Sequence, residues 1–487
     1  MNSRRHTARL IAAAVLVISA GFVIAPSGSP VRAAAVPDMG SGGEFHPLPP
    51  ARIFDSRPAF AINDVAPIGA KPLGAPNPAV FDISLLGKGG VPDDVTPENV
   101  LAVVVNITVT DPSASGYLEA YGKGARPATR TSIVNFGPGQ TVPNVAIVRP
   151  GDLGQLEIGL FGQNGTANVI VDVSGWFSTS NFVPADTAND DSSRLIPITP
   201  ARVLDTRDGT GQPDSAGQPT PGAMAAKQSI TLKIRGVNSV NPTLTAVVPN
   251  SLNVTGVLLN MVGITTDPGG TSTYVSVFPE DLPAGQNPTT SNLNLVPNAI
   301  KANLVFVPVG ADGNVRIFNL QGVTQVVADV VGYMLKGEAK TTRAGRVVPL
   351  TSPYRTFDTR DPQWGGVPLG PGQAEDWSFA QFASSVAIGP DQVGAQLAVI
   401  GNLTAASLKR QYPSVFVRSF LTAYPSCAPG VSCRPGSSNL NTVEGPPVPN
   451  MAVLTYGANN TVTFYNLAGS VDYIFDASAV ILADSPV

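Results

Sequence analysis

The stretch Arg202-Val203-Leu204-Asp205-Thr206-Arg207 carries a signature, Arg-x-x-Asp-[Ser/Thr]-Arg, that occurs three times in the chain. The other two copies are Arg52-Ile53-Phe54-Asp55-Ser56-Arg57 and Arg355-Thr356-Phe357-Asp358-Thr359-Arg360. Each copy opens a segment that ends, over a hundred residues later, in an apolar strand with one aspartate: Asp172, Asp329 or Asp476. This arrangement predicts three copies of one structural unit.

The same landmarks follow the signature in every copy. First comes an apolar strand with an asparagine, at residues 101–110, 257–264 and 397–404. In the first of these strands apolar and polar residues alternate, which is typical of a sandwich strand. An aromatic strand comes next, and its aromatic pairs are expected to fill the core. Then come two asparagines nine residues apart, with Gly and Pro between them that predict a hairpin: Asn135 and Asn144, Asn294 and Asn303, Asn441 and Asn450.

Short apolar runs bounded by Gly, Pro, Asn and Asp dominate the chain, which predicts an all-β protein. Each unit has room for roughly eight strands, as in an antiparallel β-sandwich or jelly roll. We therefore expect three tandem β-sandwich domains at residues 46–178, 195–336 and 347–484. Residues 179–194 and 337–346 are expected to be exposed linkers. Both a line of domains and a pseudo-threefold cluster remain open.

Residues 1–35 have the pattern of a signal peptide: arginines, an apolar segment at 10–25, and small residues at 33–35. Its removal takes away four Arg and no acidic residue, so 30 basic residues become 26 against 34 acidic, a formal charge of −8. No basic stripe stands out, which argues against nucleic acid as a partner. We expect a secreted protein without a transmembrane segment in its mature chain, held non-covalently if it stays at the envelope.

Two cysteines, Cys427 and Cys433, are separated by five residues. In an exported chain this spacing favours a local disulfide over a metal pair. A metal site would need more ligands, and the mature chain has one histidine, His46, and no further cysteine. No cofactor or metal is expected.

The sequences Pro-Ala-Arg-Val-Leu-Asp-Thr-Arg at 200–207, Ser-Asn-Leu-Asn at 291–294 and Val-Val-Ala-Asp-Val-Val-Gly-Tyr at 326–333 resemble tandem repeats of exported actinobacterial-type proteins. The resemblance covers almost the whole mature chain. It implies an exported protein with tandem repeats but carries over no catalytic residue. The third copy departs from the pattern, with Tyr354-Arg355 for Ala-Arg and Ala477-Ser478 where Gly-aromatic would stand.

The signature residues and late-strand aspartates are the main candidates for chemistry. A pair such as Asp55 and Asp172 has the residue type for general acid and base in glycoside hydrolysis. The alternative is a structural ion pair, because a carboxylate among Val and Ile is costly to bury without a partner. We favour the ion pair, and its candidate residues are Arg52, Asp55, Arg57, Asp172, Arg202, Asp205, Arg207, Asp329, Arg355, Asp358, Arg360 and Asp476.

The six asparagines could bind sugar hydroxyls or supply carbonyl oxygens to Ca²⁺, or they could tie loops by bonding nearby backbone groups. No serine, cysteine or zinc catalytic set is evident, since His46 stands alone beside prolines. The favoured function is a secreted, non-enzymatic binding or scaffolding protein whose partner is an envelope polysaccharide or surface protein. The alternatives are a carbohydrate-active hydrolase that uses paired aspartates, and a passive extracellular matrix or stalk protein.

Overall fold

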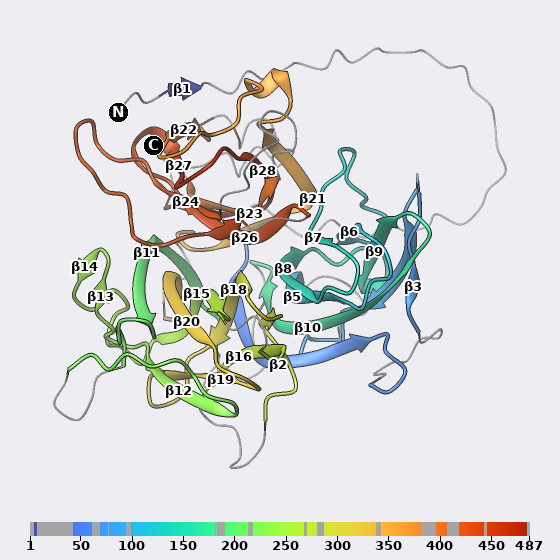
Figure 1. Cartoon of the computed structure of the whole chain (residues 1–487), viewed down its shortest axis with the longest axis horizontal. Helices are drawn as coiled ribbons and strands as arrows, with labels where there is room; N and C mark the ends of the chain where they lie inside the picture. The colour runs from blue at the N-terminus through green and yellow to red at the C-terminus, as the bar shows by residue number, and fades with distance from the viewer. Residues whose placement is uncertain are drawn as a thin grey trace.

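The structure, a computed structural model, is built almost entirely from antiparallel β-sheets, and this confirms the all-β prediction (Figure 1). It describes residues 4–6, 42–60, 69–75, 77–93, 99–180, 182, 190–212, 218–266, 270–279, 287–337, 342–380, 382, 396–406, 418–442 and 446–484. The predicted signal peptide lies outside the described residues apart from β1 (Arg4–His6), which pairs in parallel with β22 (Ala374–Ser378). Within the described part, no helix is both long and apolar enough to cross a membrane.

Repeat 1 is the unit predicted at residues 46–178, and it contains two antiparallel sheets, an inner one of five strands and an outer one of four. The inner sheet has the order β2-β10-β5-β8 and the outer sheet has the order β4-β9-β6-β7. Their strands are β2 (Phe45–Asp55), β4 (Ala79–Ser84), β5 (Val100–Thr110), β6 (Gly116–Gly122), β7 (Val134–Phe136), β8 (Val142–Val148), β9 (Gln155–Gly162) and β10 (Thr166–Ser178), with β3 (Lys71–Pro72) beside β10 and the 3-10 turn η1 (Asp152–Gly154) before β9.

Repeats 2 and 3, predicted at residues 195–336 and 347–484, have the same strand order in both sheets; repeat 2 adds the hairpin β13–β14. The inner sheets are β11-β20-β15-β18 and β21-β28-β23-β26, and the outer sheets are β12-β19-β16-β17 and β22-β27-β24-β25. In repeat 2 the strands are β11 (Arg194–Asp205), β12 (Gln228–Lys233), β13 (Ser239–Val240), β14 (Thr243–Leu244), β15 (Val254–Ile264), β16 (Thr273–Pro279), β17 (Leu293–Leu295), β18 (Ile300–Pro308), β19 (Asn314–Asn319) and β20 (Gln325–Leu335). In repeat 3 they are β21 (Val347–Asp358), β22, β23 (Gln396–Ala406), β24 (Ser419–Pro425), β25 (Leu440–Thr442), β26 (Val448–Thr455), β27 (Thr461–Asn466) and β28 (Asp472–Leu482), with 3-10 turns η2 (Pro362–Trp364) and η4 (Ala458–Asn460).

The three repeats surround a common pseudo-threefold axis (Figure 1). The edge strands β8, β18 and β26 of the inner sheets each contact the other two. Each sandwich has its own apolar core, and a fourth apolar cluster on the axis takes residues from all three repeats, among them Phe45, Phe306 and Ile400. The structure therefore favours the clustered arrangement over a line of domains.

The apolar cluster on the axis explains why both faces of β5 are buried, which its alternation of apolar and polar residues does not predict. Val103, Val105 and Ile107 face the sandwich core, while Ala102 and Val104 face the axis. All eleven residues of β5 are buried, including the polar face with Asn106 and Thr108. Because the neighbouring repeats cover the second face of the inner sheet, a polar alternation here does not mean exposure to solvent.

The prediction of a hairpin between the paired asparagines is wrong. In repeat 1, β7 pairs with β6 in the outer sheet and β8 pairs with β5 in the inner sheet. The turn between them crosses from one sheet to the other. A tight turn with Gly and Pro serves both purposes, so the sequence signal for the turn does not distinguish a hairpin from a crossing between sheets.

Two further expectations need correction. The C-terminal ends of the segments predicted as exposed linkers are buried, because Ser193, Arg194 and Arg346 lie against the axis; residues 181, 183–189 and 338–341 lie outside the described residues. Ala479, rather than Ala477, takes the position of the glycine in the Gly-aromatic pair of repeat 3. The strand register pairs Ala479 with Pro349 in the same way as it pairs Gly175 with Pro47 and Gly332 with Pro197.

Candidate functional site

The signature arginine and the late-strand aspartate of each repeat are direct neighbours across two strands. The register pairs Arg52 with Asp172, and equivalent pairs form in the other two repeats. In repeat 1 the Arg52 Nε donates to Asp172 Oδ1 at 2.9 Å and Nη2 donates to Oδ2 at 3.4 Å. Arg202 and Asp329 form the same two-pronged contact at 2.7 and 3.2 Å, and Arg355 binds Asp476 likewise. Such a fork-to-fork pair is among the stronger polar contacts in proteins.

The other two signature residues complete a four-membered charge network. In repeat 2, Arg202 Nη1 donates to Asp205 Oδ2 at 3.1 Å, and Arg207 binds both oxygens of Asp205 at 2.6 and 2.8 Å. The corresponding contacts join Arg52, Asp55 and Arg57, and also Arg355, Asp358 and Arg360. Two guanidinium groups thus neutralise two carboxylates in every repeat.

Burial acts differently on the two carboxylates of a network. Burial raises the pKa of Asp329, which is fully enclosed, although Arg202 opposes the shift. Burial also acts to raise the pKa of Asp205, but hydrogen bonds and charge from Arg207 and Arg202 outweigh it and bring that pKa below its usual value. The arginine responds in the matching direction: despite desolvation, its two acidic partners raise the pKa of Arg202. The inner aspartate therefore depends on its arginine to remain charged.

An asparagine extends this network into a polar row across the inner sheet. We use the name polar row for the signature arginine, the late-strand aspartate and the asparagine of the central strand. That asparagine pairs in register with the aspartate: Asn106 with Asp172, Asn260 with Asp329 and Asn402 with Asp476. The polar row lies on the face of the inner sheet that the next repeat covers.

Each polar row binds the loop of the next repeat. Asn106 Nδ2 donates to the Ser291 carbonyl of repeat 2 at 2.9 Å, Asn260 donates to Ser438 of repeat 3, and Asn402 donates to Ser132 of repeat 1. Two of the signature arginines also donate to the loop of the next repeat. Arg202 Nη2 donates to the Gly436 carbonyl at 3.1 Å, and Arg355 Nη2 donates to the Arg130 carbonyl at 2.9 Å. The signature thus reaches across the boundaries between repeats.

The six asparagines singled out by their spacing fall into two groups. Asn144, Asn303 and Asn450 are buried on the edge strands, and each donates to the polar-row asparagine of a neighbouring repeat: Asn402, Asn106 and Asn260, at 2.8, 3.1 and 2.8 Å. Asn135 and Asn294 donate to the serine hydroxyl three residues before them, each at 3.1 Å. Asn441 Nδ2 is buried without a hydrogen-bond partner among the described residues. The first group joins repeats and the second ties its own loop.

We expect Asn450→Ala to lower the free energy of unfolding by at least about 2 kcal/mol. The substitution leaves the Leu304 N–H of repeat 2 without its acceptor and Asn260 Oδ1 without its donor. Chemical denaturation followed by circular dichroism measures the loss. Asn253→Ala, at an exposed position, is the control and should change little. Equal effects from the two substitutions would contradict the role of Asn450 between repeats.

The disulfide lies in the loop of repeat 3 that contacts repeat 2. Cys427 and Cys433 are bonded, with Cα atoms 5.7 Å apart. Further along the same loop, Gly436 binds Arg202 through its carbonyl, and its N–H donates to Asn241 Oδ1 at 3.1 Å. The crosslink therefore restrains a segment that holds two repeats together.

Reduction of this disulfide is expected to destabilise the protein by about 2–3 kcal/mol at most, because the closed loop is short. The measurement is the thermal unfolding midpoint with and without reductant. The Cys427→Ser/Cys433→Ser variant should unfold like the reduced wild type and should not respond to reductant. A wild type that does not respond to reductant would contradict this expectation.

A second group of charges lies where the first strands of the repeats meet. We call Glu44, Arg194 and Arg346 the axial charge cluster. Arg194 Nε donates to Glu44 Oε1 at 2.9 Å, and Arg346 Nη2 lies 3.6 Å from the same oxygen. Arg194 is 1% exposed, and burial together with the nearby Arg194 lowers the pKa of Arg346. Sequence reasoning missed this cluster, although each member directly precedes the first apolar residue of its strand.

The aromatic pairs do not fill the sandwich cores as expected. In repeat 1 the pair is Tyr117 and Tyr121, which alternate along β6 with the core residues Leu118 and Ala120 and so lie on the face away from the core, where Tyr121 is still buried. Tyr117 stacks on Phe161 with ring centroids 4.5 Å apart, and the guanidinium groups of Arg126 and Arg130 lie over that ring at 5.6 and 5.2 Å. In repeat 3 the guanidinium group of Arg434 likewise lies over the ring of Tyr465, 4.0 Å from the ring centroid.

One group of described residues has the composition of a metal site. His46, Asp190 and Asp191 place one ligand atom each within 4.8 Å of one another. His46 already binds Asp191 through Nδ1 at 2.9 Å, and its ring stacks on Trp176 with centroids 4.0 Å apart. The imidazole is thus held by packing and by one carboxylate, which fixes the start of β2.

No family model and no curated protein matches the chain. Among solved structures, one described as the triple jelly roll fold and turret assembly in an archaeal virus is 9% identical, covers 89% of this chain and 91% of its own, and has a TM-score of 0.16. A second, from Sulfolobus turreted icosahedral virus, is 10% identical over 90% of this chain and 92% of its own, also with a TM-score of 0.16. At these TM-scores neither likeness carries an argument.

Proposed function

We propose that the protein is a secreted, non-enzymatic scaffold or binding protein of the cell envelope, built from three β repeats of the exported actinobacterial type. The observation that carries this proposal is that the signature residues pair with one another. The aspartates that a hydrolase would need are enclosed by arginines and by the loop of the next repeat. A cluster of three packed repeats suits a protein that presents surfaces rather than one that transforms a substrate.

The export part of the proposal has a direct test. Protein recovered from the culture medium of the source cells should begin near residue 36 when its N-terminus is sequenced. Protein found only inside the cells, with residues 1–35 intact, would contradict export.

The binding part is tested by incubating the mature chain with purified envelope polysaccharide and with envelope protein fractions. Binding to one of these fractions, retained in Asp172→Asn if that variant stays folded, is the expected result. Absence of binding to every fraction counts against it and favours a passive matrix protein. Hydrolysis of the polysaccharide that disappears in a folded Asp172→Asn or Asp329→Asn variant would favour the carbohydrate-active hydrolase instead.

A further inference from the structure

A small cavity lies where turns of all three repeats meet. Repeat 1 contributes β7, the turn after it and the start of β8, repeat 2 contributes β17 and the start of β18, and repeat 3 contributes Pro446, Pro447 and the start of β26. We call it the axial cavity; its volume is about 30 Å³. Its lining residues are Asn135, Gln140, Val142, Pro143, Leu293, Lys301, Ala302, Pro446, Pro447, Val448 and Pro449.

One of the three equivalent positions that line this cavity carries a cation, and the other two are apolar. Val142, Lys301 and Val448 hold equivalent positions, each two residues before the edge-strand asparagine of its repeat. Two repeats thus place a valine where repeat 2 places a lysine. Among the described residues, no other charged side chain lines the cavity and none forms an ion pair with Lys301. Lys301 is half-buried, and this burial lowers the pKa of its ammonium group.

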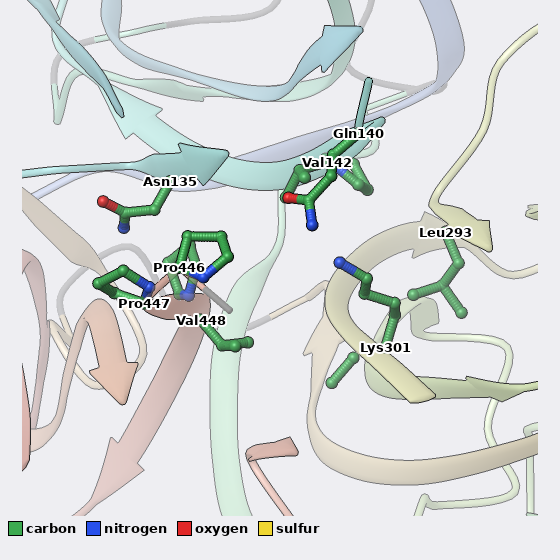
Figure 2. A pocket seen from close by; sticks show the side chains of 11 residues that line it. Asn135, Gln140, Val142, Leu293, Lys301, Pro446, Pro447 and Val448 are labelled. Atoms are coloured by element: carbon green, nitrogen blue, oxygen red, sulfur yellow. The ribbon is translucent and has the colours of Figure 1, made fainter. Parts of the chain in front are cut away.

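The polar groups of the cavity are arranged to meet an anion. In Figure 2 the amine of Lys301 and the amide of Gln140 point toward the same space, with Pro446 and Pro447 beside it. Gln140 Oε1 accepts the Gly137 N–H at 2.9 Å, which turns the amide nitrogen of this side chain away from its own turn and leaves it as a donor. An ammonium group and an amide N–H are both hydrogen-bond donors.

The size of the axial cavity limits its occupant. A water molecule needs about 10–15 Å³ of such space, so the cavity corresponds to about two to three water-sized groups. A sugar ring or a nucleotide is too large to lie wholly inside this volume. A carboxylate group, with two oxygens and one negative charge, fits both the volume and the donors.

We propose that the axial cavity binds the carboxylate of a small organic anion, with Lys301 as its charge partner and Gln140 as a second donor. The ligand then joins residues of three repeats at one point. This site does not depend on the proposed envelope function, because it follows from the cavity and its charge alone.

Acetate is the probe that tests this site. The thermal unfolding midpoint of the mature chain is measured against acetate at constant ionic strength, and the binding of ¹³C-acetate is followed by NMR line width. A saturable effect is expected in the wild type. In Lys301→Val, which restores the valine found in the other two repeats and should fold, the apparent affinity should fall by more than about tenfold. Lys233→Met, at an exposed position in β12, is the control and should bind like the wild type.

Three outcomes would overturn the proposal. One is a wild type that shows no saturable response to acetate. The second is an equal response in Lys301→Val and wild type, which would mean a general solvent effect. The third concerns Glu444, two residues before Pro446 and outside the described residues: a response that appears only in Glu444→Gln would mean that the chain's own carboxylate is the partner of Lys301.

Discussion

Arg202→Met is expected to lower the free energy of unfolding by about 3–5 kcal/mol, the largest effect of any single substitution considered for repeat 2. The change leaves Asp329, which is fully buried, without the guanidinium that neutralises it. It also removes the contact with the Gly436 carbonyl of repeat 3. Denaturant unfolding of the mature chain, followed by circular dichroism, measures the loss.

The loss in Arg202→Met should shrink at acid pH. Without its arginine, Asp329 in the folded protein has a pKa raised above its value in the unfolded chain, because burial disfavours the charged form. A raised carboxyl pKa destabilises the fold at pH values above that pKa. The penalty is relieved as the pH falls through the raised pKa, when the folded state takes up a proton. A loss that grows at acid pH would contradict this account.

Two variants serve as controls for Arg202→Met. Arg207→Met should cost less, because the Arg207 side chain is half exposed and Asp205 keeps Arg202 as a partner. The double variant Arg202→Met/Asp329→Leu should recover most of the lost stability, since an apolar pair of similar volume often replaces a buried ion pair at no cost. A loss below about 1 kcal/mol in Arg202→Met would mean that the pair behaves like a surface salt bridge.

Glu44→Gln is expected to cost about 3–5 kcal/mol as well, and to weaken all three repeats together. The substitution keeps the shape of the side chain but leaves Arg194 and Arg346 without the carboxylate that lies between them. The thermal unfolding midpoint of the whole chain measures the effect. Asp111→Asn, a similar loss of one charge at an exposed position, is the control and should stay near wild type. Equal midpoints for the two variants would contradict the role of the axial charge cluster.

The strands of each repeat follow from the sequence because alternation and turn residues are local signals. The strand around Asn106 was predicted at residues 101–110, and β5 spans Val100–Thr110. The contact between Arg202 and Asp329 can also be predicted, since an aspartate among Val and Ile requires a cation nearby. These inferences need no knowledge of how the repeats are placed in space.

What the sequence does not reveal is the contact between repeats. Asn106 and Thr108 look like the solvent face of a strand, yet the neighbouring repeat buries them. Glu44 and Arg194 look like ordinary charged residues before a strand, and only the axis brings them together. The cause is the same in both cases: the partner lies more than a hundred residues away, in another copy of the unit, and periodicity within one unit carries no information about it.

Differential scanning calorimetry of the mature chain tests the central claim most directly, namely that the signature residues join three repeats into one unit around the axis. One cooperative unit has a calorimetric enthalpy equal to its van't Hoff enthalpy. We predict a single transition with a ratio near one, which falls apart into separate transitions in Arg202→Met. Three independent transitions in the wild type, with a ratio of about three, would contradict the claim.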